Sequence, residues 1–161
     1  MKQTPLGKLK KVSGRLLRLL TGQAETPEEP PVPRMLVVDD EESICFSMSD
    51  YFSHHGFEVD TANDLDEAER LIAAKDYKII IQDLRLGATR HPDGLDIIRR
   101  AHEKNPATRI IVLTAYGSAE LEGEARRRGA SAFLPKPQPL SQVAQIVQGL
   151  IESPPKRARS A

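Results

Sequence analysis

The chain has 161 residues, in which 23 Lys and Arg balance 23 Asp and Glu, and it contains one cysteine. This length predicts a single domain with terminal extensions. One cysteine excludes an intramolecular disulfide framework and a metal site built from several cysteines. No apolar run approaches the roughly 18 residues of a membrane span, and Arg15 and Arg18 interrupt the best candidate for a secretory apolar region. We therefore expect a cytoplasmic protein.

Charge is unevenly distributed along the chain. Residues 1–34 carry a net charge of +4, residues 35–152 carry −7, and residues 153–161 carry +3. A domain that reads DNA would carry its basic residues on the folded part. The acidic middle of the chain therefore predicts that the protein does not bind DNA directly.

The two ends of the chain differ in composition from its middle. Residues 1–22 combine basic residues with an apolar helical pattern, which predicts a helix that contacts an anionic membrane or an acidic partner. A disordered basic tail explains the same residues equally well. Residues 23–33 contain four prolines and predict an extended linker. We expect a folded domain at 34–152 and a basic tail at 153–161.

Five apolar segments alternate with five amphipathic segments between these ends. The expected strands are residues 35–38, 57–62, 77–82, 108–113 and 131–134, and the expected helices begin near residues 43, 64, 95, 118 and 140. This alternation predicts an α/β fold with a five-stranded parallel sheet, right-handed crossovers and helices on both faces. Three of the strands are continuously apolar and fit positions buried on both faces, whereas residues 57–62 alternate with polar residues and fit an edge.

Two of the expected helices carry recognisable start signals. Asp64 and Glu67 have the spacing of a capping box, and Ser118 can cap the helix that follows it. Cys45 falls within the first helical pattern, where we expect it to be a buried apolar residue.

The polar residues at the strand ends form the candidate functional site. Asp39 and Asp40 follow the first strand, Asp83 follows the third, Thr114 the fourth and Lys136 the fifth. Because the carboxyl ends of parallel strands share one edge of the sheet, we expect these side chains to lie close together. Three neighbouring carboxylates repel one another unless a cation joins them, and oxygen-only ligands favour Mg²⁺.

This set of residues suits the chemistry of phosphoryl transfer. A carboxylate beside Mg²⁺ can act as a nucleophile toward a phosphoryl group. Lys136 and Thr114 can then neutralise and hydrogen-bond the oxygens of the transferred group. Taken alone, Asp39-Asp40 is more typical of a helix N-terminus with a carboxylate in its first turn, and the phosphoryl-transfer interpretation depends on Asp83 and Lys136 following their strands in the same way.

The sequence resembles the receiver domain of two-component response regulators over roughly residues 34–152. The resemblance rests on the order and spacing of Val37-Val38-Asp39-Asp40-Glu41, Asp83-Leu84, Asp93-Gly94-Leu95, Leu113-Thr114-Ala115, Gly129-Ala130 and Phe133-Leu134-Pro135-Lys136-Pro137. It implies a flavodoxin-like (βα)₅ fold with strand order 2-1-3-4-5. It also implies that Asp83 accepts a phosphoryl group from the phosphohistidine of a sensor histidine kinase or a histidine phosphotransfer protein.

The resemblance implies further roles for residues of the site. Asp39, Asp40, Asp83 and the backbone carbonyl of Arg85 would bind Mg²⁺. Lys136 would contact the phosphoryl group.

The resemblance also implies how the signal leaves the site. Thr114 would move toward the phosphoryl group, and Phe133 would swing inward as a switch aromatic. The surface formed by about residues 118–151 would then change its affinity for a downstream protein or for a second copy of the chain. We expect Arg85 and Tyr116 to influence the lifetime of the phosphoryl group, and we expect only self-phosphorylation and self-dephosphorylation rather than a free-standing enzyme.

The sequence departs from the family at the loop after Asp83. Gly87 stands where members usually have proline, and the loop to Asp93 is about three residues longer than usual. Both changes loosen this loop, because glycine is freer than proline. The last expected helix ends nine residues before the end of the sequence, which predicts a single-domain regulator.

Two other functions are compatible with parts of the pattern. A pseudo-receiver would be a protein-interaction module whose acids no longer cycle phosphate, and the departures at Gly87 favour it. An aspartate-nucleophile phosphatase would carry a D-x-D motif after its first strand, whereas Asp39 and Asp40 are contiguous. The complete acid set favours the phosphoacceptor over both.

Overall fold

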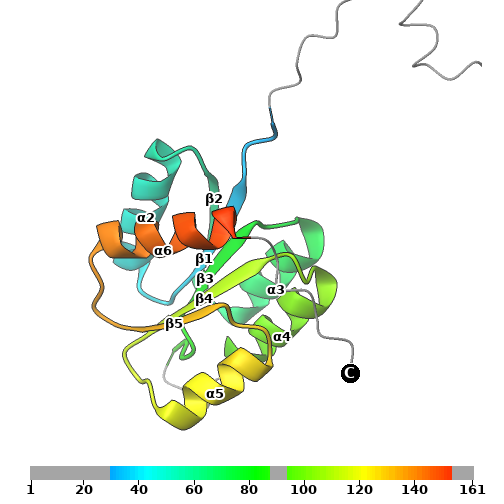
Figure 1. Ribbon diagram of the computed structural model, residues 1–161, viewed down its shortest axis with the longest axis vertical. Coiled ribbons are helices and arrows are strands. Elements are labelled where there is room, and N and C mark those ends of the chain that lie inside the picture. Colours follow the sequence, from blue (N-terminus) through cyan, green and yellow to red (C-terminus); the bar gives the residue numbers. More distant parts are fainter. Residues whose placement is uncertain (1–29, 88–93, 154–161) are drawn as a thin grey trace, which may run out of the picture. The chain divides into compact units, whose positions relative to one another are not determined.

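The computed structural model describes residues 30–87 and 94–153 (Figure 1). Most of these residues belong to one compact unit, Val32–Ala161. The expected basic extension at 1–22, residues 23–29 of the expected linker and residues 154–161 of the expected tail lie outside the described residues. Within the described ranges, no helix is long and apolar enough to cross a membrane.

Five parallel strands form a single sheet with the order β2-β1-β3-β4-β5 (Figure 1). The strands are β1 (Arg34–Val38), β2 (Glu58–Ala62), β3 (Ile79–Gln82), β4 (Arg109–Thr114) and β5 (Ala132–Pro135). The helices are α2 (Glu42–His54), α3 (Leu65–Ala74), α4 (Gly94–Lys104), α5 (Ala119–Arg127) and α6 (Leu140–Glu152). The predicted flavodoxin-like fold and strand order are confirmed.

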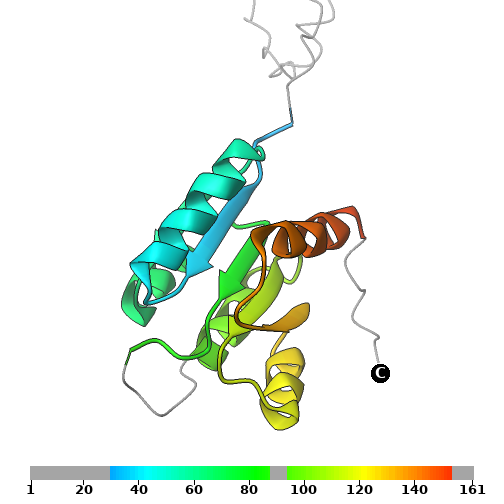
Figure 2. The same ribbon diagram turned by 90° about the vertical axis from the view of Figure 1, so that its left-hand side faces the viewer.

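Helices cover both faces of the sheet, with α2 and α6 on one face and α3, α4 and α5 on the other (Figures 1 and 2). The apolar run of β3 explains how one strand serves both layers, because successive side chains point to opposite faces. Ile79 and Ile81 pack in the cluster with α2 and α6, and Ile80 packs in the cluster with α3 and α4. Cys45 is buried on α2 as expected, and burial raises the pKa of its thiol to about 11.

Two helix starts have the expected caps. The side chain of Asp64 accepts the N–H of Glu67 at 2.8 Å, and Ser118 Oγ accepts the N–H of Leu121 at 3.1 Å. The return bond of the first cap differs slightly from a capping box, because the Glu67 carboxylate accepts the N–H of Asn63 at 3.2 Å. These bonds satisfy free N–H groups at the helix ends that face the carboxyl edge of the sheet.

Several element boundaries differ from the sequence-based expectation, and one difference affects the site. The fourth strand extends through Thr114, which therefore belongs to β4 rather than following it. The reason is pairing with β5: Thr114 lies opposite Pro135, and its carbonyl accepts the N–H of Lys136 at 2.9 Å. The end of β4 and the start of the Lys136 segment are thus fixed to each other.

Candidate functional site

Three carboxylates meet at the carboxyl edge of the sheet. Asp39 and Asp40 follow β1, and Asp83 follows β3, which pairs with β1 so that Val38 lies opposite Gln82. The N–H of Asp83 donates to the carbonyl of Val38 at 2.9 Å, which continues this pairing to the acid itself. One carboxylate oxygen from each acid lies within 4.8 Å of the others.

Lys136 reaches this acid group from the end of the edge strand β5. It follows β5, and its Nζ lies 2.5 Å from Asp39 Oδ2 and 2.8 Å from Asp83 Oδ2. The side chains of Lys136, Asp39 and Asp83 are 11%, 4% and 9% exposed, so both ion pairs are shielded from solvent. Two buried carboxylates therefore share one ammonium group.

The surroundings of Asp39 and Lys136 shift their protonation in defined directions. Burial raises the pKa of Asp39, although hydrogen bonds from Lys136 and from the N–H of Glu41 act in the opposite direction. Burial alone would lower the pKa of Lys136, but the hydrogen bonds to Asp39 and Asp83 outweigh it and the pKa is raised. The lysine therefore remains an ammonium group at neutral pH.

Asp40 is held differently from the other two acids. Its side chain is exposed, and its Oδ2 accepts the backbone N–H of Gly87 at 2.9 Å. Two residues earlier in the same loop, the N–H of Arg85 donates to Asp83 Oδ1 at 3.2 Å. The segment that follows the candidate phosphoacceptor therefore contacts two of the three acids.

Thr114 lies at the end of β4 and is fully buried. Its Oγ1 accepts the N–H of Tyr116 at 3.3 Å, so the hydroxyl is held by the loop that leads to α5. Phe133 on β5 is half-buried and packs against the core cluster on the side of α4 and α5. A Cβ atom built on Gly117 would lie 3.1 Å from Cε1 of this ring, which places the aromatic directly against the Thr114 loop.

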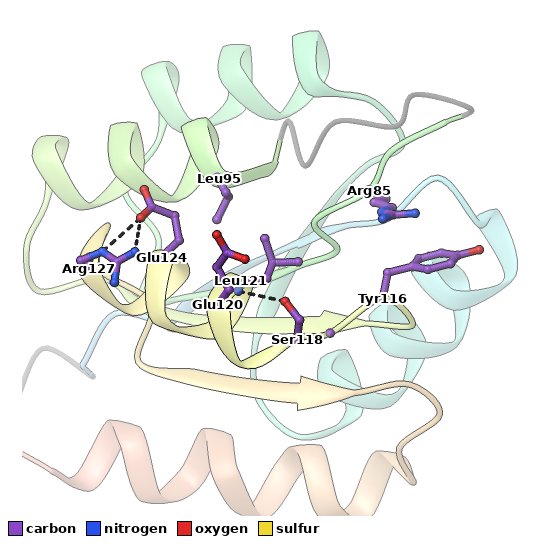
Figure 3. Close-up of a pocket in the computed structure, with 9 residues that line it drawn as sticks. Arg85, Leu95, Tyr116, Ser118, Glu120, Leu121, Glu124 and Arg127 are labelled. Atoms are coloured by element: carbon purple, nitrogen blue, oxygen red, sulfur yellow. Dashed lines mark hydrogen bonds and ion pairs between the residues drawn. The ribbon is translucent and has the colours of Figure 1, made fainter.

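Arg85 and Tyr116 form a contact that the sequence did not reveal. The Arg85 guanidinium lies over the Tyr116 ring, 4.2 Å from its centroid. The pair stands at one end of a cavity of about 600 Å³ between the loop and α5, and the Glu124–Arg127 ion pair stands at the other end (Figure 3). The two residues that were expected to influence the phosphoryl group thus contact each other.

Gly94 explains a second part of the family motif. A Cβ at this position would lie 2.7 Å from the backbone oxygen of Asp83 and 2.8 Å from Nε2 of the buried Gln82. Glycine is therefore required for α4 to begin against the end of β3. Asp93, which precedes it in the motif, lies outside the described residues.

The acid group has the donor chemistry of a metal site. Its ligand atoms are carboxylate oxygens, which suit a hard divalent cation. The three acids could bind a metal ion together, with Asp39 and Asp83 shared between the ion and Lys136. The structure therefore brings together Asp39, Asp40, Asp83 and Lys136 as predicted. Thr114 lies at the end of β4, and Phe133 lies on the adjacent strand β5.

The fold and the acidic edge define a receiver-type domain, and comparison with known families agrees. The model of the response regulator receiver domain family matches residues 35–148, and the chain belongs to this family. Family membership implies a kinase partner in two-component signalling.

The curated relatives include regulatory and response regulator proteins. The chain is 31% identical over 130 residues to the photosynthetic apparatus regulatory protein RegA of Cereibacter sphaeroides, a match that covers 79% of the chain and 69% of RegA. It is 30% identical over 116 residues to the response regulator protein PilR of Pseudomonas aeruginosa and 31% identical over 121 residues to the regulatory protein AtoC of Escherichia coli. These matches cover 71% and 75% of the chain, but it spans only 25% of PilR and 26% of AtoC.

Solved structures of receiver proteins share the fold. A response regulator protein from Burkholderia pseudomallei, solved with a phosphorylated aspartic acid, a calcium ion and citrate, matches with 30% identity and a TM-score of 0.66. That match covers 72% of this chain and 66% of the other. A CheY-like receiver domain protein from Methanospirillum hungatei matches with 23% identity and a TM-score of 0.70, covering 75% and 94% of the two chains, and supports the fold alone.

Proposed function

We propose that the protein is a phosphoacceptor response regulator in a two-component or phosphorelay system, phosphorylated on Asp83. The observation that carries the proposal is the shared ion pair in which Lys136 Nζ contacts both Asp39 and Asp83 at a buried sheet edge. The phosphoryl donor would be the phosphohistidine of a sensor histidine kinase or a histidine phosphotransfer protein. The Burkholderia pseudomallei relative with a phosphorylated aspartic acid supports the same chemistry.

The transfer can be written with this chain's own residues. A carboxylate oxygen of Asp83 attacks the phosphorus atom, the phosphorus–nitrogen bond breaks, and the histidine nitrogen keeps the electron pair. Mg²⁺, held by Asp39, Asp40, Asp83 and the Arg85 carbonyl, would supply positive charge that offsets the phosphoryl oxygens. Lys136, already placed at Asp83, would neutralise a further phosphoryl oxygen.

The signal would pass from Asp83 to the surface through Thr114 and Phe133. The Thr114 hydroxyl accepts a hydrogen bond from Tyr116 and keeps its own proton free to donate to a phosphoryl oxygen. A shift of Thr114 would move the loop that contains Gly117, against which the Phe133 ring packs. The surface of α5, β5 and α6 would then change its affinity for a downstream protein or a second copy of the chain.

The remaining parts of the proposal follow from charge and chemistry. The protein would act in the cytoplasm and would catalyse only its own phosphorylation and dephosphorylation. Residues 34–152 would not bind DNA directly, because residues 35–152 carry a net charge of −7. One relative, the alginate biosynthesis transcriptional regulatory protein AlgB of Pseudomonas putida, is named as a regulator of transcription and is 32% identical over 104 residues. The chain spans only 22% of AlgB, so this name does not count against the proposal that residues 34–152 do not bind DNA.

The basic residues of the extension carry a separate proposal. Residues 1–22 would contact an anionic membrane or an acidic partner. Liposome cosedimentation of the full chain should then weaken with salt and disappear when residues 1–22 are deleted. Unchanged cosedimentation after the deletion would contradict the proposal.

The central experiment is incorporation of phosphate into the purified full chain. The protein is incubated with acetyl phosphate and Mg²⁺, and its intact mass is measured. We expect one added phosphoryl group, which is lost when Mg²⁺ is chelated and in the Asp83→Asn variant. Asp50→Asn is the matched control, because Asp50 is exposed on α2 and outside the site.

The same experiment separates the phosphoacceptor from its alternative. A pseudo-receiver, which the departure from proline at Gly87 and the longer loop favour, would show no added phosphoryl group. A phosphoryl group that survives Asp83→Asn would also overturn the assignment of Asp83.

A further inference from the structure

The bond between Gly87 and Asp40 links two parts of the site that are 47 positions apart in the sequence. Lys136 holds Asp39 and Asp83, whereas the backbone N–H of Gly87 donates to Asp40 Oδ2 at 2.9 Å. Because Asp40 is exposed, its orientation would otherwise be free to vary. The loop N–H therefore selects one orientation of this carboxylate.

The identity of residue 87 decides whether this bond can exist. Gly87 has a φ of +78°, a backbone conformation that side chains disfavour, although a Cβ there would meet no atom within 4 Å. Proline, the residue usual at this position in the family, has no N–H and fixes φ near −65°. A chain with proline here could not donate this hydrogen bond.

A second N–H of the same segment acts in the same way. Arg85 N–H donates to Asp83 Oδ1 at 3.2 Å, two residues before Gly87. The N–H groups of Arg85 and Gly87 thus hold one oxygen each of Asp83 and Asp40, and a carboxylate that accepts a hydrogen bond at one oxygen can still bind a cation through the other. Hydrogen bonds from outside the ligand set commonly fix the orientation of metal-binding carboxylates.

We propose that Gly87 is a positioning residue for the divalent-cation site, whose N–H orients Asp40 and couples cation binding to the conformation of the segment 85–87. The inference rests on the proposed function in one respect, namely that Asp39, Asp40 and Asp83 bind Mg²⁺. It does not require that phosphoryl transfer occurs. The departure from proline at residue 87 is, in this view, a replacement of a rigid ring by a hydrogen bond.

The test compares the Mg²⁺ affinity of two variants of the full chain by isothermal titration calorimetry. Gly87→Pro removes the N–H, and Gly87→Asn keeps it, since asparagine tolerates positive φ better than most residues. Loss of an outer partner of a metal ligand weakens affinity by about 10–100-fold. We expect a weakening in this range for Gly87→Pro and an affinity close to that of the wild type for Gly87→Asn.

A spectroscopic measurement keeps the proposal testable if proline disturbs the loop in other ways. In wild-type protein, hydrogen exchange of the Gly87 amide should be slow without Mg²⁺ and slower still with it. Asp40→Ala, which leaves the backbone of residue 87 unchanged, should accelerate this exchange. Asp50→Ala is the control and should have no effect.

Three outcomes would overturn the inference: equal or tighter Mg²⁺ binding by Gly87→Pro, unchanged Gly87 exchange in Asp40→Ala, or no Mg²⁺ binding by the wild type. Phosphorylation by acetyl phosphate is measured separately on the same samples. If the wild-type chain binds Mg²⁺ and the variants behave as expected, but no phosphoryl group is added, the proposed function is contradicted and the inference stands. If the chain is phosphorylated but Gly87→Pro binds Mg²⁺ as tightly as the wild type, the inference on Gly87 is contradicted and the proposed function stands.

Discussion

The ammonium nitrogen of Lys136 lies 2.8 Å from Oδ2 of Asp83, although β4 separates the strands that these two residues follow. The lysine side chain spans this distance because β5 is fixed to β4 up to Thr114 and Pro135. The same nitrogen contacts Asp39 on the far side of Asp83. The central acids and the edge strand are therefore joined by one cation.

Removing the Lys136 ammonium group should destabilise the fold, and Mg²⁺ should reverse this destabilisation. Lys136→Met leaves two buried carboxylates without their partner, a change that costs about 3 kcal/mol or more of unfolding free energy. Mg²⁺ should then stabilise the variant more than the wild type, because it replaces the lost positive charge. Urea unfolding with and without Mg²⁺ measures both effects.

The exposed Lys78 provides the control for this prediction. Lys78→Met should change neither the unfolding free energy nor its Mg²⁺ dependence appreciably. Equal Mg²⁺ stabilisation of the Lys136 variant and the wild type would show that the acids and the cation are not linked as described.

The Arg85–Tyr116 stack should control how long Asp83 stays phosphorylated. The stack stands beside the carboxyl edge of the sheet, where Asp83 lies. Its loss should give water easier access to phosphorylated Asp83. A cation–π contact of this kind is worth about 0.5–1 kcal/mol, which predicts a roughly two- to fivefold faster loss of phosphate in Tyr116→Ala. Decay of the phosphorylated species, followed by intact mass, gives the rate.

Arg85→Ala and the double variant test whether the two residues act together. If the stack is the active unit, the double variant should lose phosphate no faster than either single variant. Rates that multiply in the double variant would mean that each side chain acts alone.

Phe46 should contribute to recognition of the protein that donates the phosphoryl group. Its side chain is 74% exposed on the second turn of α2, which begins near Asp40, and large exposed aromatics of this kind commonly anchor interfaces. Phe46→Ser should reduce the rate of phosphotransfer from a cognate phosphohistidine protein by about tenfold. Phosphorylation by acetyl phosphate should remain at the wild-type rate.

Ser43→Ala, an exposed change on the same helix, is the control for Phe46. A parallel loss with both donors would place the effect in the site rather than in docking. An unchanged rate with the protein donor would remove Phe46 from the interface.

Asp60 should give the fold an acid-sensitive contribution to stability. Its carboxylate accepts two contacts from Lys75 Nζ at 2.9 and 2.8 Å and one from the Tyr77 hydroxyl at 2.7 Å. Burial alone would raise the pKa of Asp60, but these bonds outweigh it and the pKa is lowered. A lowered folded-state pKa stabilises the protein above the unfolded value of about 3.9, and this stabilisation is lost as the pH falls through the folded pKa.

Asp60→Ala should therefore cost about 1–3 kcal/mol at neutral pH and less below the unfolded pKa. Chemical unfolding across this pH range measures the difference. Asp66→Ala, exposed at the start of α3, is the control and should cost little. A constant difference between Asp60→Ala and the wild type at every pH would contradict the assigned direction of the pKa shift.

The fold and the central acids were predictable because they depend on strand patterns. Three consecutive isoleucines in β3 indicate a strand buried on both faces, and such strands deliver their next residue to one edge of the sheet. Asp39, Asp83 and Lys136 follow strands in this way and meet as expected. No knowledge of side-chain conformation was needed to place them.

The loop contacts were not predictable from the same reasoning. The Gly87–Asp40 bond depends on a positive φ at one residue, and the Arg85–Tyr116 stack depends on the rotamers of two long side chains. Neither quantity follows from hydrophobic periodicity. Thr114 was placed after its strand rather than in it, because pairing with β5 extends β4 beyond the apolar run.

Lys136 also sets an order of events during synthesis of the chain. Asp39 leaves the ribosome 97 residues before the lysine that neutralises it. A nascent chain that ends before β5 contains both acids but lacks the ammonium group that contacts them in the complete fold. If Asp83 is the phosphoacceptor, competence for phosphorylation should therefore arise only when the fifth strand has been made and added to the sheet.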